Sequence, residues 1–245
     1  MSRILITGST DGIGRATAVS LLDDGHEVIV HARTQQRLTA VEDLISRGAS
    51  GVVGDLALSE EVEQIAEQAN RIGALDAVVH NAGIIDGSSL LPVNVVAPYV
   101  LTAAIQGPGR LIYLSSSMHR GGQADLTGAD WSGSRKSVSY SDSKLFATTL
   151  MAAVARLRPA SISHAVDPGW VPTKLGGPGA TDDLALSHVT QSWLATTDDS
   201  QALVSGGYWH HRRTEVPHRA VGDEQFQTHL LAELAQHTGI QLSSN

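Results

Sequence analysis

The stretch Thr7-Gly8-Ser9-Thr10-Asp11-Gly12-Ile13-Gly14 follows the apolar run Ile4-Leu5-Ile6 and precedes a segment with helical patterning, residues 15–24. Glycine at such positions permits a tight turn and lets a pyrophosphate approach the backbone, while the N-terminus of the following helix offers free N–H groups. The glycines match neither the G-x-G-x-x-G spacing nor a P-loop, which ends in Lys-Ser/Thr. An ordinary strand-to-helix turn is the alternative, but the position between the first strand and the first helix favours a nucleotide-binding loop.

The composition supports a folded core and excludes several kinds of site. Of the 245 residues, 42% are hydrophobic and 17% are charged, which is not the composition of a disordered chain. The formal net charge of -8 argues against nucleic-acid binding, because neutralising phosphates requires clustered basic residues. Cysteine is absent, which excludes disulfides, thiolate metal sites and a cysteine nucleophile. The absence fits a reducing compartment, and we expect a cytoplasmic protein.

We expect neither a signal peptide nor a membrane span. The first apolar run ends at Gly8, which is too short for a signal peptide. The stretch 87–109 carries no charge, but Pro92, Asn94 and Pro98 interrupt it. A helix that crosses a bilayer is therefore not expected there, and the stretch is interpreted as a buried helix with a loop.

Short runs that are apolar on both faces recur along the chain and are typical of buried parallel strands. They are Leu5-Ile6, Val28-Ile29-Val30, Val52-Val53, Ala77-Val78-Val79, Leu111-Ile112-Tyr113-Leu114 and Ile162 to Val166. Helical stretches alternate with these runs. The pattern predicts the α/β class: a single-domain, Rossmann-type doubly wound parallel sheet with helices on both faces, spanning residues 1–245.

The ends of three helices are also predicted. The first helix should stop at Gly25. Ser59 is positioned to cap a helix whose first turn holds Glu60 and Glu61, where the helix dipole favours negative charge. Residues 223–238 should form a terminal helix.

Two loops follow predicted strands at the carboxyl edge of the sheet, where ligands bind in open α/β sheets. Residues 117–137 and 171–181 are rich in Gly, Ser, Asp and Pro. We expect 117–137 and 171–195 to line the substrate site. The tryptophans Trp131, Trp170 and Trp193 suggest an apolar pocket, although each is equally compatible with packing.

Tyr140 and Lys144 are four residues apart, so on a helix they share one face. An ammonium beside a phenol is expected to lower the pKa of the tyrosine and make it a usable acid or base. The alternative is a surface pair on an amphipathic helix. The charge-free segment Leu145 to Ala155 favours a helix buried on more than one side, against its own sheet and against a second subunit.

Four motifs in order resemble the short-chain dehydrogenase/reductase family. They are Thr7-Gly8-x-x-x-Gly12-Ile13-Gly14, His80-Asn81-Ala82-Gly83, Tyr140-Ser141-Asp142-Ser143-Lys144 and Pro168-Gly169-Trp170-Val171-Pro172-Thr173. The resemblance covers nearly the whole chain. His80 stands where the family usually has Asn, at what we expect to be a structural turn.

The separation of 24 residues between Ser116 and Tyr140 is longer than is usual in the family. With Tyr-Ser-Asp-Ser-Lys-Leu, this spacing resembles the retinol-dehydrogenase-like branch, whose members are often membrane-anchored. The chain begins at its first strand, so we expect no anchor. The family also implies a homodimer or homotetramer.

The resemblance implies a catalytic set of Asn94, Ser116, Tyr140 and Lys144. Ser116 would hold the substrate oxygen, with Ser115 or Ser117 as alternatives. Asn94 would organise a proton path to the lysine, or would bond to backbone. The implied substrate is a small carbonyl compound or a primary or secondary alcohol.

The resemblance also implies the residues that contact a nicotinamide cofactor. They are Gly8, Ser9, Thr10, Asp11, Gly12, Ile13, Gly14, Arg33, Asp55, Leu56, Asn81, Ala82, Gly83, Tyr140, Lys144, Pro168, Gly169, Val171 and Thr173. Asp55 would read the adenine amino group or would cap a turn.

The end of the second strand bears on the choice between NADP and NAD. An acidic residue there holds the adenosine ribose of NAD, whereas an arginine accommodates the 2′-phosphate of NADP. Ala32 occupies the position where the acid is expected and Arg33 follows it, which predicts NADP, with NAD possible. Asp11 counts against this, because NADP enzymes of the family often carry a basic residue there.

Two other kinds of function fit the same fold. A non-catalytic NAD(P)-binding regulator or redox sensor need not retain Asn94, Ser116, Tyr140 and Lys144 together. A sugar-nucleotide epimerase or dehydratase usually has other glycine spacing and needs more residues. No metal site is predicted, because no histidine pair has zincin spacing. His119 could touch substrate, but a solvated loop histidine is the commoner case.

Overall fold

One eight-stranded sheet runs through the computed structural model, which describes residues 1–243. The strands are β1 (Arg3–Ile6), β2 (Glu27–Ala32), β3 (Ser50–Val53), β4 (Ala77–His80), β5 (Arg110–Leu114), β6 (Ile162–Asp167), β7 (Tyr208–His210) and β8 (Arg213–Glu215). Their spatial order is β3-β2-β1-β4-β5-β6-β7-β8. All neighbours from β3 to β7 pair in parallel, and β8 returns antiparallel to β7. The order reverses between β1 and β4, which is where doubly wound sheets bind ligands.

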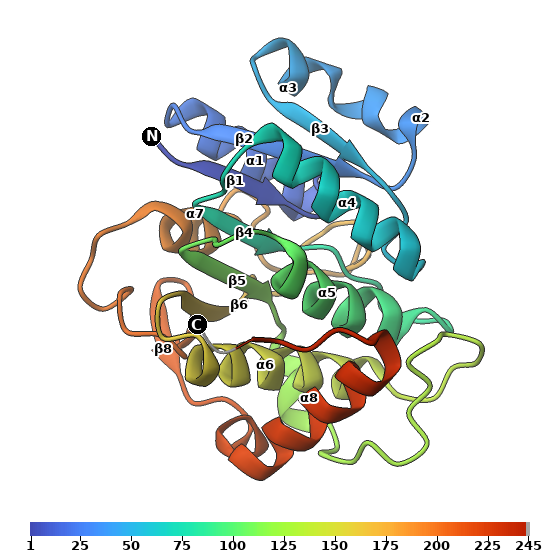
Figure 1. Ribbon diagram of the computed structural model, residues 1–245. Coiled ribbons are helices and arrows are strands. Elements are labelled where there is room, and N and C mark those ends of the chain that lie inside the picture. The colour runs from blue at the N-terminus through green and yellow to red at the C-terminus, as the bar shows by residue number, and fades with distance from the viewer. Residues whose placement is uncertain (244–245) are drawn as a thin grey trace.

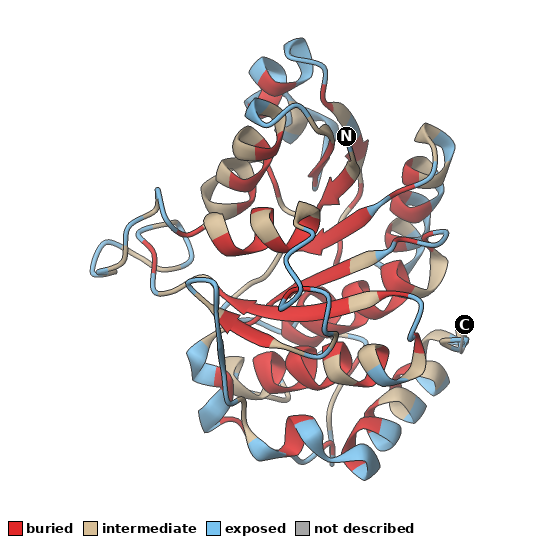
Figure 2. Ribbon diagram, turned by 90° about the vertical axis from the view of Figure 1, so that its left-hand side faces the viewer, coloured by how far each residue is buried: buried red, intermediate tan, exposed pale blue. Residues whose placement is uncertain are grey.

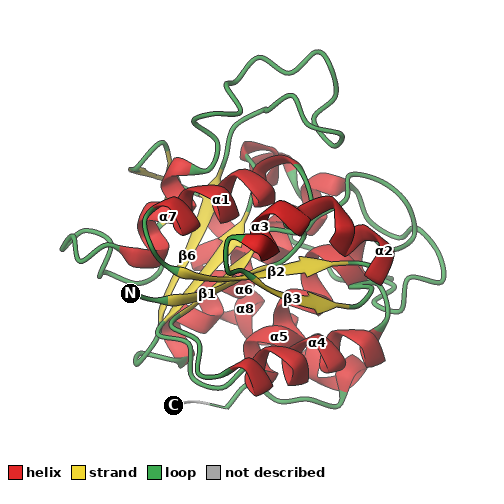
Figure 3. Ribbon diagram, turned by 90° about the horizontal axis from the view of Figure 1, so that it is seen from above, coloured by secondary structure: helices red, strands yellow, loops and turns green. Residues whose placement is uncertain are grey.

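Helices cover both faces of this sheet (Figures 1 and 3). They are α1 (Gly12–Asp23), α2 (Gln35–Leu38), α3 (Glu42–Ser46), α4 (Ser59–Ile72), α5 (Ala97–Ala104), α6 (Tyr140–Leu157), α7 (Val189–Thr196) and α8 (Glu224–Thr238). One apolar cluster joins the sheet to α4, α5, α6 and α8, and a second joins the opposite face to α1, α3 and α7.

Alternate residues of the buried strands enter opposite clusters. In β1, Leu5 packs on the α4–α6 side, whereas Ile4 and Ile6 pack on the α1–α7 side, and all three have an exposed fraction of 0%. Figure 2 shows the resulting buried sheet between half-exposed helices. A strand buried on both faces is apolar at most positions, which is why the short apolar runs predicted the strands. The predicted doubly wound α/β fold is confirmed.

The cap predicted at Ser59 is wrong. Leu58 occupies the N-cap position with an extended backbone, and Ser59 is the first residue of α4. Because its own backbone is already helical, the Ser59 side chain makes no cap hydrogen bond to the helix start. Glu60 and Glu61 lie in the first turn, as expected from the helix dipole.

The second buried side of α6 is covered by the chain itself. Helix α8 packs along α6 (Figure 1). The rings of Phe146 and Phe226 lie 6.1 Å apart between them. The Tyr99 hydroxyl donates to the Ile240 carbonyl at 2.6 Å, so residues after α8 lie against α5. The apolar character of α6 therefore does not require a second subunit.

His80 was expected to lie in a turn, and this prediction is wrong. It is the last residue of β4, has an exposed fraction of 3%, and stacks on Tyr113 with 4.6 Å between ring centroids. Its Nε2 lies 3.2 Å from the Thr102 hydroxyl, which also contacts the Tyr113 hydroxyl. Full burial lowers the pKa of His80 to about 3. The imidazole is therefore neutral and serves as a packing group in the core.

Candidate active site

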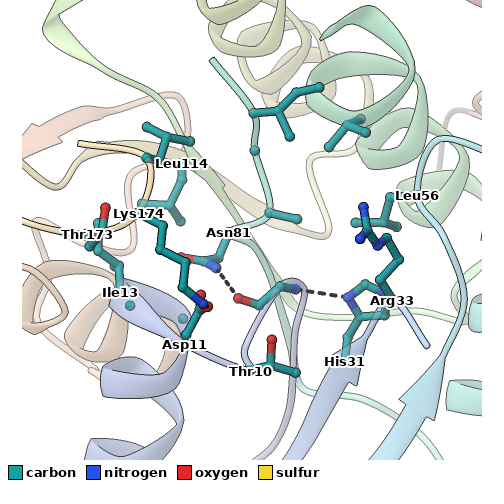
Figure 4. A pocket seen from close by; sticks show the side chains of 18 of the residues that line it. Thr10, Asp11, Ile13, His31, Arg33, Leu56, Asn81, Leu114, Thr173 and Lys174 are labelled. Atoms are coloured by element: carbon teal, nitrogen blue, oxygen red, sulfur yellow. Dashed lines mark hydrogen bonds and ion pairs between the residues drawn. The ribbon is translucent and has the colours of Figure 1, made fainter. Parts of the chain in front are cut away.

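A cavity of about 470 Å³ opens at the carboxyl ends of the strands, a size typical of small-molecule sites (Figure 4). It joins the glycine loop to the start of α6. Its lining residues are Gly8, Thr10, Asp11, Gly12, Ile13, Gly14, His31, Arg33, Arg37, Asp55, Leu56, Asn81, Ala82, Gly83, Ile84, Val93, Leu114, Ser115, Tyr140, Lys144, Pro168, Thr173, Lys174 and Leu175. Most of the predicted cofactor residues are among them.

The glycine loop has the backbone that its sequence suggests. Gly8 has a φ of 62° and Gly12 a φ of 54°, in the left-handed region that side chains disfavour. A Cβ on Gly14 would lie 2.5 Å from the Gly8 carbonyl oxygen. Asn81 holds the loop from β4, donating to the carbonyls of Thr7 at 2.8 Å and Gly8 at 3.1 Å. These contacts keep the loop open for a ligand's phosphates.

His31 supports the same loop from β2, and sequence reasoning did not find it. The Gly8 backbone N–H donates to His31 Nδ1 at 2.9 Å, and Nε2 lies 2.8 Å from the Gly54 carbonyl (Figure 4). Because the Gly8 N–H can only donate, Nδ1 is the acceptor and Nε2 carries the proton. Burial lowers the pKa of His31, which keeps the ring neutral.

The N-terminus of α1 points its free N–H groups into this cavity. Asp11 occupies the N-cap position but its side chain makes no cap hydrogen bond. The carboxylate instead pairs with Lys174 at 2.6 Å and Arg37 at 3.1 Å. The Lys174 hydrogen bond is the main reason that the pKa of Asp11 is lowered. Sequence reasoning missed Arg37 and Lys174, because nothing local links either residue to Asp11.

These contacts bring together the two loops that flank the cavity. Lys174 lies in the loop after β6, and the Thr173 methyl is 3.2 Å from where a Cβ of Gly12 would lie. Arg37, on α2, also donates to the Thr10 hydroxyl at 3.0 Å. A bound phosphate would therefore meet a preformed group of cations.

Arg33 and Asp55 lie at the β2–β3 end of the cavity (Figure 4). Arg33 is exposed and directly follows β2. The Asp55 carboxylate accepts the Ala57 backbone N–H at 2.9 Å, so the turn-capping alternative is realised. Leu56 is buried beside it.

Tyr140 and Lys144 lie at the other end of the cavity. Tyr140 is the first residue of α6, after Ser139, which forms a capping box with Asp142. Lys144 has an exposed fraction of only 4%, and its ammonium donates to the Leu114 carbonyl at 2.7 Å. It also lies 5.7 Å from the centroid of the Tyr140 ring. The pair therefore shares one face, as predicted.

The expected lowering of the tyrosine pKa is wrong for this state of the protein. Burial raises the pKa of Tyr140 to about 12, and a hydrogen bond with Ser116 only partly opposes it. Burial likewise lowers the pKa of Lys144 to about 8. Desolvation penalises the charged form of both groups, and the ammonium is engaged with Leu114 rather than with the phenol. At neutral pH the tyrosine is a neutral proton donor.

Asn94 lies in a π-helical segment, Pro92–Val96, which precedes α5. Its carboxamide accepts the Ile84 N–H at 2.9 Å and donates to the Ile84 carbonyl at 2.9 Å and to the Ser143 hydroxyl at 3.0 Å. A Cβ on Gly83 would lie 3.4 Å from both Asn94 Oδ1 and Lys144 Nζ. The alternative in which Asn94 bonds to backbone is therefore realised. The Asn94 carboxamide and the Lys144 ammonium both lie close to Gly83.

The three serines after β5 have different surroundings. The Ser115 hydroxyl is buried and paired with Thr148 at 2.6 Å. Ser116 is half-buried and interacts with Tyr140, and its hydroxyl also accepts the Met118 N–H at 3.2 Å. Ser117 is exposed. Of the three, Ser116 has the contact with Tyr140.

Some predicted cofactor residues do not line the cavity: Ser9, Gly169 and Val171. Ser9 has an exposed fraction of 0%, and its hydroxyl donates to the Ile6 carbonyl and accepts the His31 N–H. Val171 is buried as well. Both side chains are buried outside the cavity lining, so the cofactor contacts expected of Ser9 and Val171 stay predictions.

The tryptophans do not form one pocket. Trp131 is buried and packs near Phe146, and Trp193 packs on Trp209. Trp170 is 55% exposed, with its indole N–H donated to the Gly176 carbonyl at 2.8 Å. Only Trp170 therefore remains available to a ligand. His119 was expected to be a solvated loop histidine, but its exposed fraction is 0%.

Within residues 1–243 no cluster of three or more His, Cys, Asp or Glu side chains is arranged to hold a metal ion. In the same residues, every helix is too short or too polar to cross a membrane.

Comparison with known proteins gives a consistent result. A family model described as short chain dehydrogenase matches residues 2–182. The relative named short-chain dehydrogenase chyC, from Penicillium rubens, is 36% identical, and the match covers 99% of each chain.

Solved structures share the fold. An uncharacterized protein from Mycobacterium Paratuberculosis has a TM-score of 0.81 at 22% identity, covering 99% of this chain and 95% of its own. A blue fluorescent protein from a metagenomic library, in complex with NADPH, has a TM-score of 0.70 at 22% identity, covering 85% of this chain and 95% of its own.

Proposed function

The chain belongs to the short-chain dehydrogenase family of NAD(P)-dependent oxidoreductases, and we propose that it transfers a hydride between NADP and a small carbonyl or alcohol substrate, with Tyr140 as the general acid and base. One observation carries the proposal: a single cavity extends from the glycine loop and Arg33 to Tyr140 and Lys144.

The cavity fits a dinucleotide. Gly8, Gly12 and Gly14 leave room for phosphates, and the start of α1 supplies N–H donors. Asn81, Ala82 and Gly83 line the same cavity and would contact the middle of the cofactor, and Tyr140 and Lys144 would meet its nicotinamide end. When bound, the nicotinamide supplies or accepts the hydride, and the protein supplies orientation and proton transfer.

Selection of NADP over NAD rests on charge at the adenosine end. Arg33 would meet a 2′-phosphate there, and Arg37 also lines the cavity. Asp11, which counted against NADP in the sequence, is already paired with Arg37 and Lys174. Its charge is therefore compensated before a ligand arrives.

The catalytic proposal follows from the protonation states. Tyr140, whose pKa is about 12, holds its proton at neutral pH. With Ser116 it would bind the oxygen of a substrate carbonyl and donate the proton as negative charge develops there. Lys144, still mostly protonated below pH 8, would stabilise the phenolate that remains. Asn94 would orient Lys144 and its surroundings through Ile84 and Ser143.

The finer assignments stay predictions. They include the retinol-dehydrogenase-like branch, a cytoplasmic location and assembly as a homodimer or homotetramer. A dimer cannot use the face of α6 that α8 covers. Residues 117–137 and 171–195 remain the proposed substrate loops, with Trp170 the exposed aromatic side chain.

Replacing Tyr140 by Phe tests the proposal. The variant keeps the ring and loses the acid, so turnover should fall by at least about 100-fold, while the dissociation constant of NADPH stays within about twofold. The measurements are loss of nicotinamide absorbance with a carbonyl panel and titration of NADPH fluorescence. Turnover that survives the change would contradict the assignment. Cofactor binding without turnover by the wild-type chain would favour a regulator or redox sensor.

A further inference from the structure

His119 is buried directly behind the proposed catalytic serine. It lies in the short 3₁₀ turn Ser117–Gly121, which follows β5. Its backbone N–H and its Nδ1 both approach the Ser116 carbonyl oxygen, at 3.0 Å and 2.7 Å. Its Nε2 accepts the backbone N–H of His218 at 3.0 Å. All the hydrogen-bonding capacity of the imidazole is therefore used inside the protein.

The partner of each ring nitrogen fixes the tautomer. A backbone N–H can only donate, so Nε2 must hold a lone pair toward His218. The proton then lies on Nδ1, which donates to the Ser116 carbonyl. Protonation of Nε2 would place two N–H groups face to face and break the contact with His218. A neutral ring with one orientation is thus required.

The His119 ring is held in place by residues of β7 and β8, the last two strands of the sheet. It packs on the Tyr208 ring with 4.7 Å between centroids, and the Tyr208 hydroxyl donates to the buried Asp167 carboxylate at 3.2 Å. Arg120 lies over the Tyr208 ring and pairs with Glu215 of β8 at 2.6 Å. The turn that carries Ser116 is therefore joined to β7 and β8.

We propose that His119 is a positioning residue: its Nδ1–H fixes the Ser116 backbone so that the serine hydroxyl faces Tyr140, and the segment 208–218 holds His119 in place. The inference rests on the proposed function of Ser116. His119 itself does not touch substrate, because its ring is fully buried. A displacement of the serine by a fraction of an ångström would misalign the carbonyl oxygen between two donors.

Desolvation supports a neutral His119. Burial lowers its pKa, and the Ser116 carbonyl only partly opposes that effect. The charged or titratable groups that face it are Arg120 on its own turn, Asp167 on β6, Tyr208 on β7 and His218. Within the pH range where the enzyme is folded, the contact should persist.

Two amide substitutions separate the two hydrogen bonds. In His119→Asn the amide N–H₂ can take the place of Nδ1 and still donate to Ser116, but nothing reaches His218. In His119→Gln the amide oxygen can take the place of Nε2 and accept from His218, but the donor to Ser116 is lost. A positioning role predicts that kcat falls about tenfold or more in His119→Gln and less than about threefold in His119→Asn.

The measurement is NADPH oxidation with a panel of aliphatic aldehydes, acetophenones and ortho-quinones, beside the NADPH dissociation constant. That constant should stay within about twofold in both variants, because neither His119 nor Ser116 lines the dinucleotide cavity. Equal losses in the two variants, or a larger loss in His119→Asn, would overturn the inference.

A double-mutant cycle with Ser116→Ala gives the second readout. If His119 acts through Ser116, His119→Gln should cost less than about twofold when Ser116 is already alanine. A merely structural role predicts the full loss in both backgrounds and would overturn the inference. If Ser116→Ala retains full turnover, or the wild-type chain reduces no carbonyl, the proposed function fails first, and the inference with it.

Discussion

Replacing Lys144 by Met should stabilise the chain at neutral pH while removing its activity. Lys144 has an exposed fraction of 4%, and burial lowers the pKa of its ammonium from the ordinary 10.5 to about 8. Burying the charged ammonium costs desolvation free energy and so lowers the stability of the folded state. Methionine fills a similar space and carries no charge, so it avoids this cost. The lysine is therefore retained for function, at the expense of the folded state.

The magnitude follows from the two pKa values. Between pH 8 and 10.5 the unfolded chain binds a proton at Lys144 that the folded chain has released, so stability rises with pH in that window. Each pH unit corresponds to about 1.4 kcal/mol, which gives roughly 3 kcal/mol over the window. The methionine variant lacks this gain. Its advantage over wild type should be largest below pH 8 and should shrink by about 3 kcal/mol toward pH 10.5.

Urea denaturation at several pH values between 7 and 10.5 measures this difference. The absence of cysteine removes thiol chemistry as a complication at high pH. The control is Lys136→Met, since that side chain is 56% exposed and paired with Asp86 on the surface. Its difference from wild type should not drift by more than a few tenths of a kcal/mol. A difference for Lys144→Met that is constant with pH, or that grows, would refute the reasoning.

Three further predictions concern ligand binding and pH. Arg33→Ala should weaken NADPH binding about tenfold and leave NADH binding within about twofold, as calorimetry would show, and equal losses would argue against 2′-phosphate recognition. Lys174→Met should leave Asp11 paired with Arg37 alone and accelerate NADPH release by at most about fivefold, because the ion pair is exposed, and stopped-flow release that is unchanged would argue against a role of this ion pair in holding NADPH. The kcat/KM for carbonyl reduction should be flat below pH 8 and fall as Lys144 loses its proton above it, while Tyr140 stays protonated. A rise in that profile above pH 8 would contradict the proposed roles.

The strands were predictable because their burial is uniform. Each apolar run in the sequence falls inside a strand or extends to its edge, as Val28-Ile29-Val30 does within β2. Helix ends were less predictable. The terminal helix was placed within one residue, because Asp223 caps it and Gly239 ends it with a positive φ. Ser59 failed as a cap because an adjacent residue with no capping side chain takes that position.

The site was predictable where its chemistry is local in sequence. The glycine loop and the Tyr140–Lys144 pair each lie within one short segment, and their spacing carries their geometry. The groups that were missed act over long separations: Lys174 pairs with Asp11 across 163 residues, and His119 meets the backbone of His218 across 99. No pattern in one sequence reports such contacts. The direction of the Tyr140 pKa was also missed, because spacing conveys proximity and not desolvation.

The proposed proton-transfer groups and the cations near the glycine loop come from different parts of the fold. Lys144 is held by the Leu114 carbonyl, the last residue of β5, and the next residue, Ser115, donates its N–H to Val166 of β6 at 2.7 Å. The proposed proton-transfer groups are thus anchored to the sheet, and sites built on regular elements hold their side chains more precisely than sites built on loops. Cations such as Lys174 come from connecting segments. Substitutions in those segments should therefore change which ligand binds, whereas changes at the ends of β5 and β6 should alter the chemical step itself.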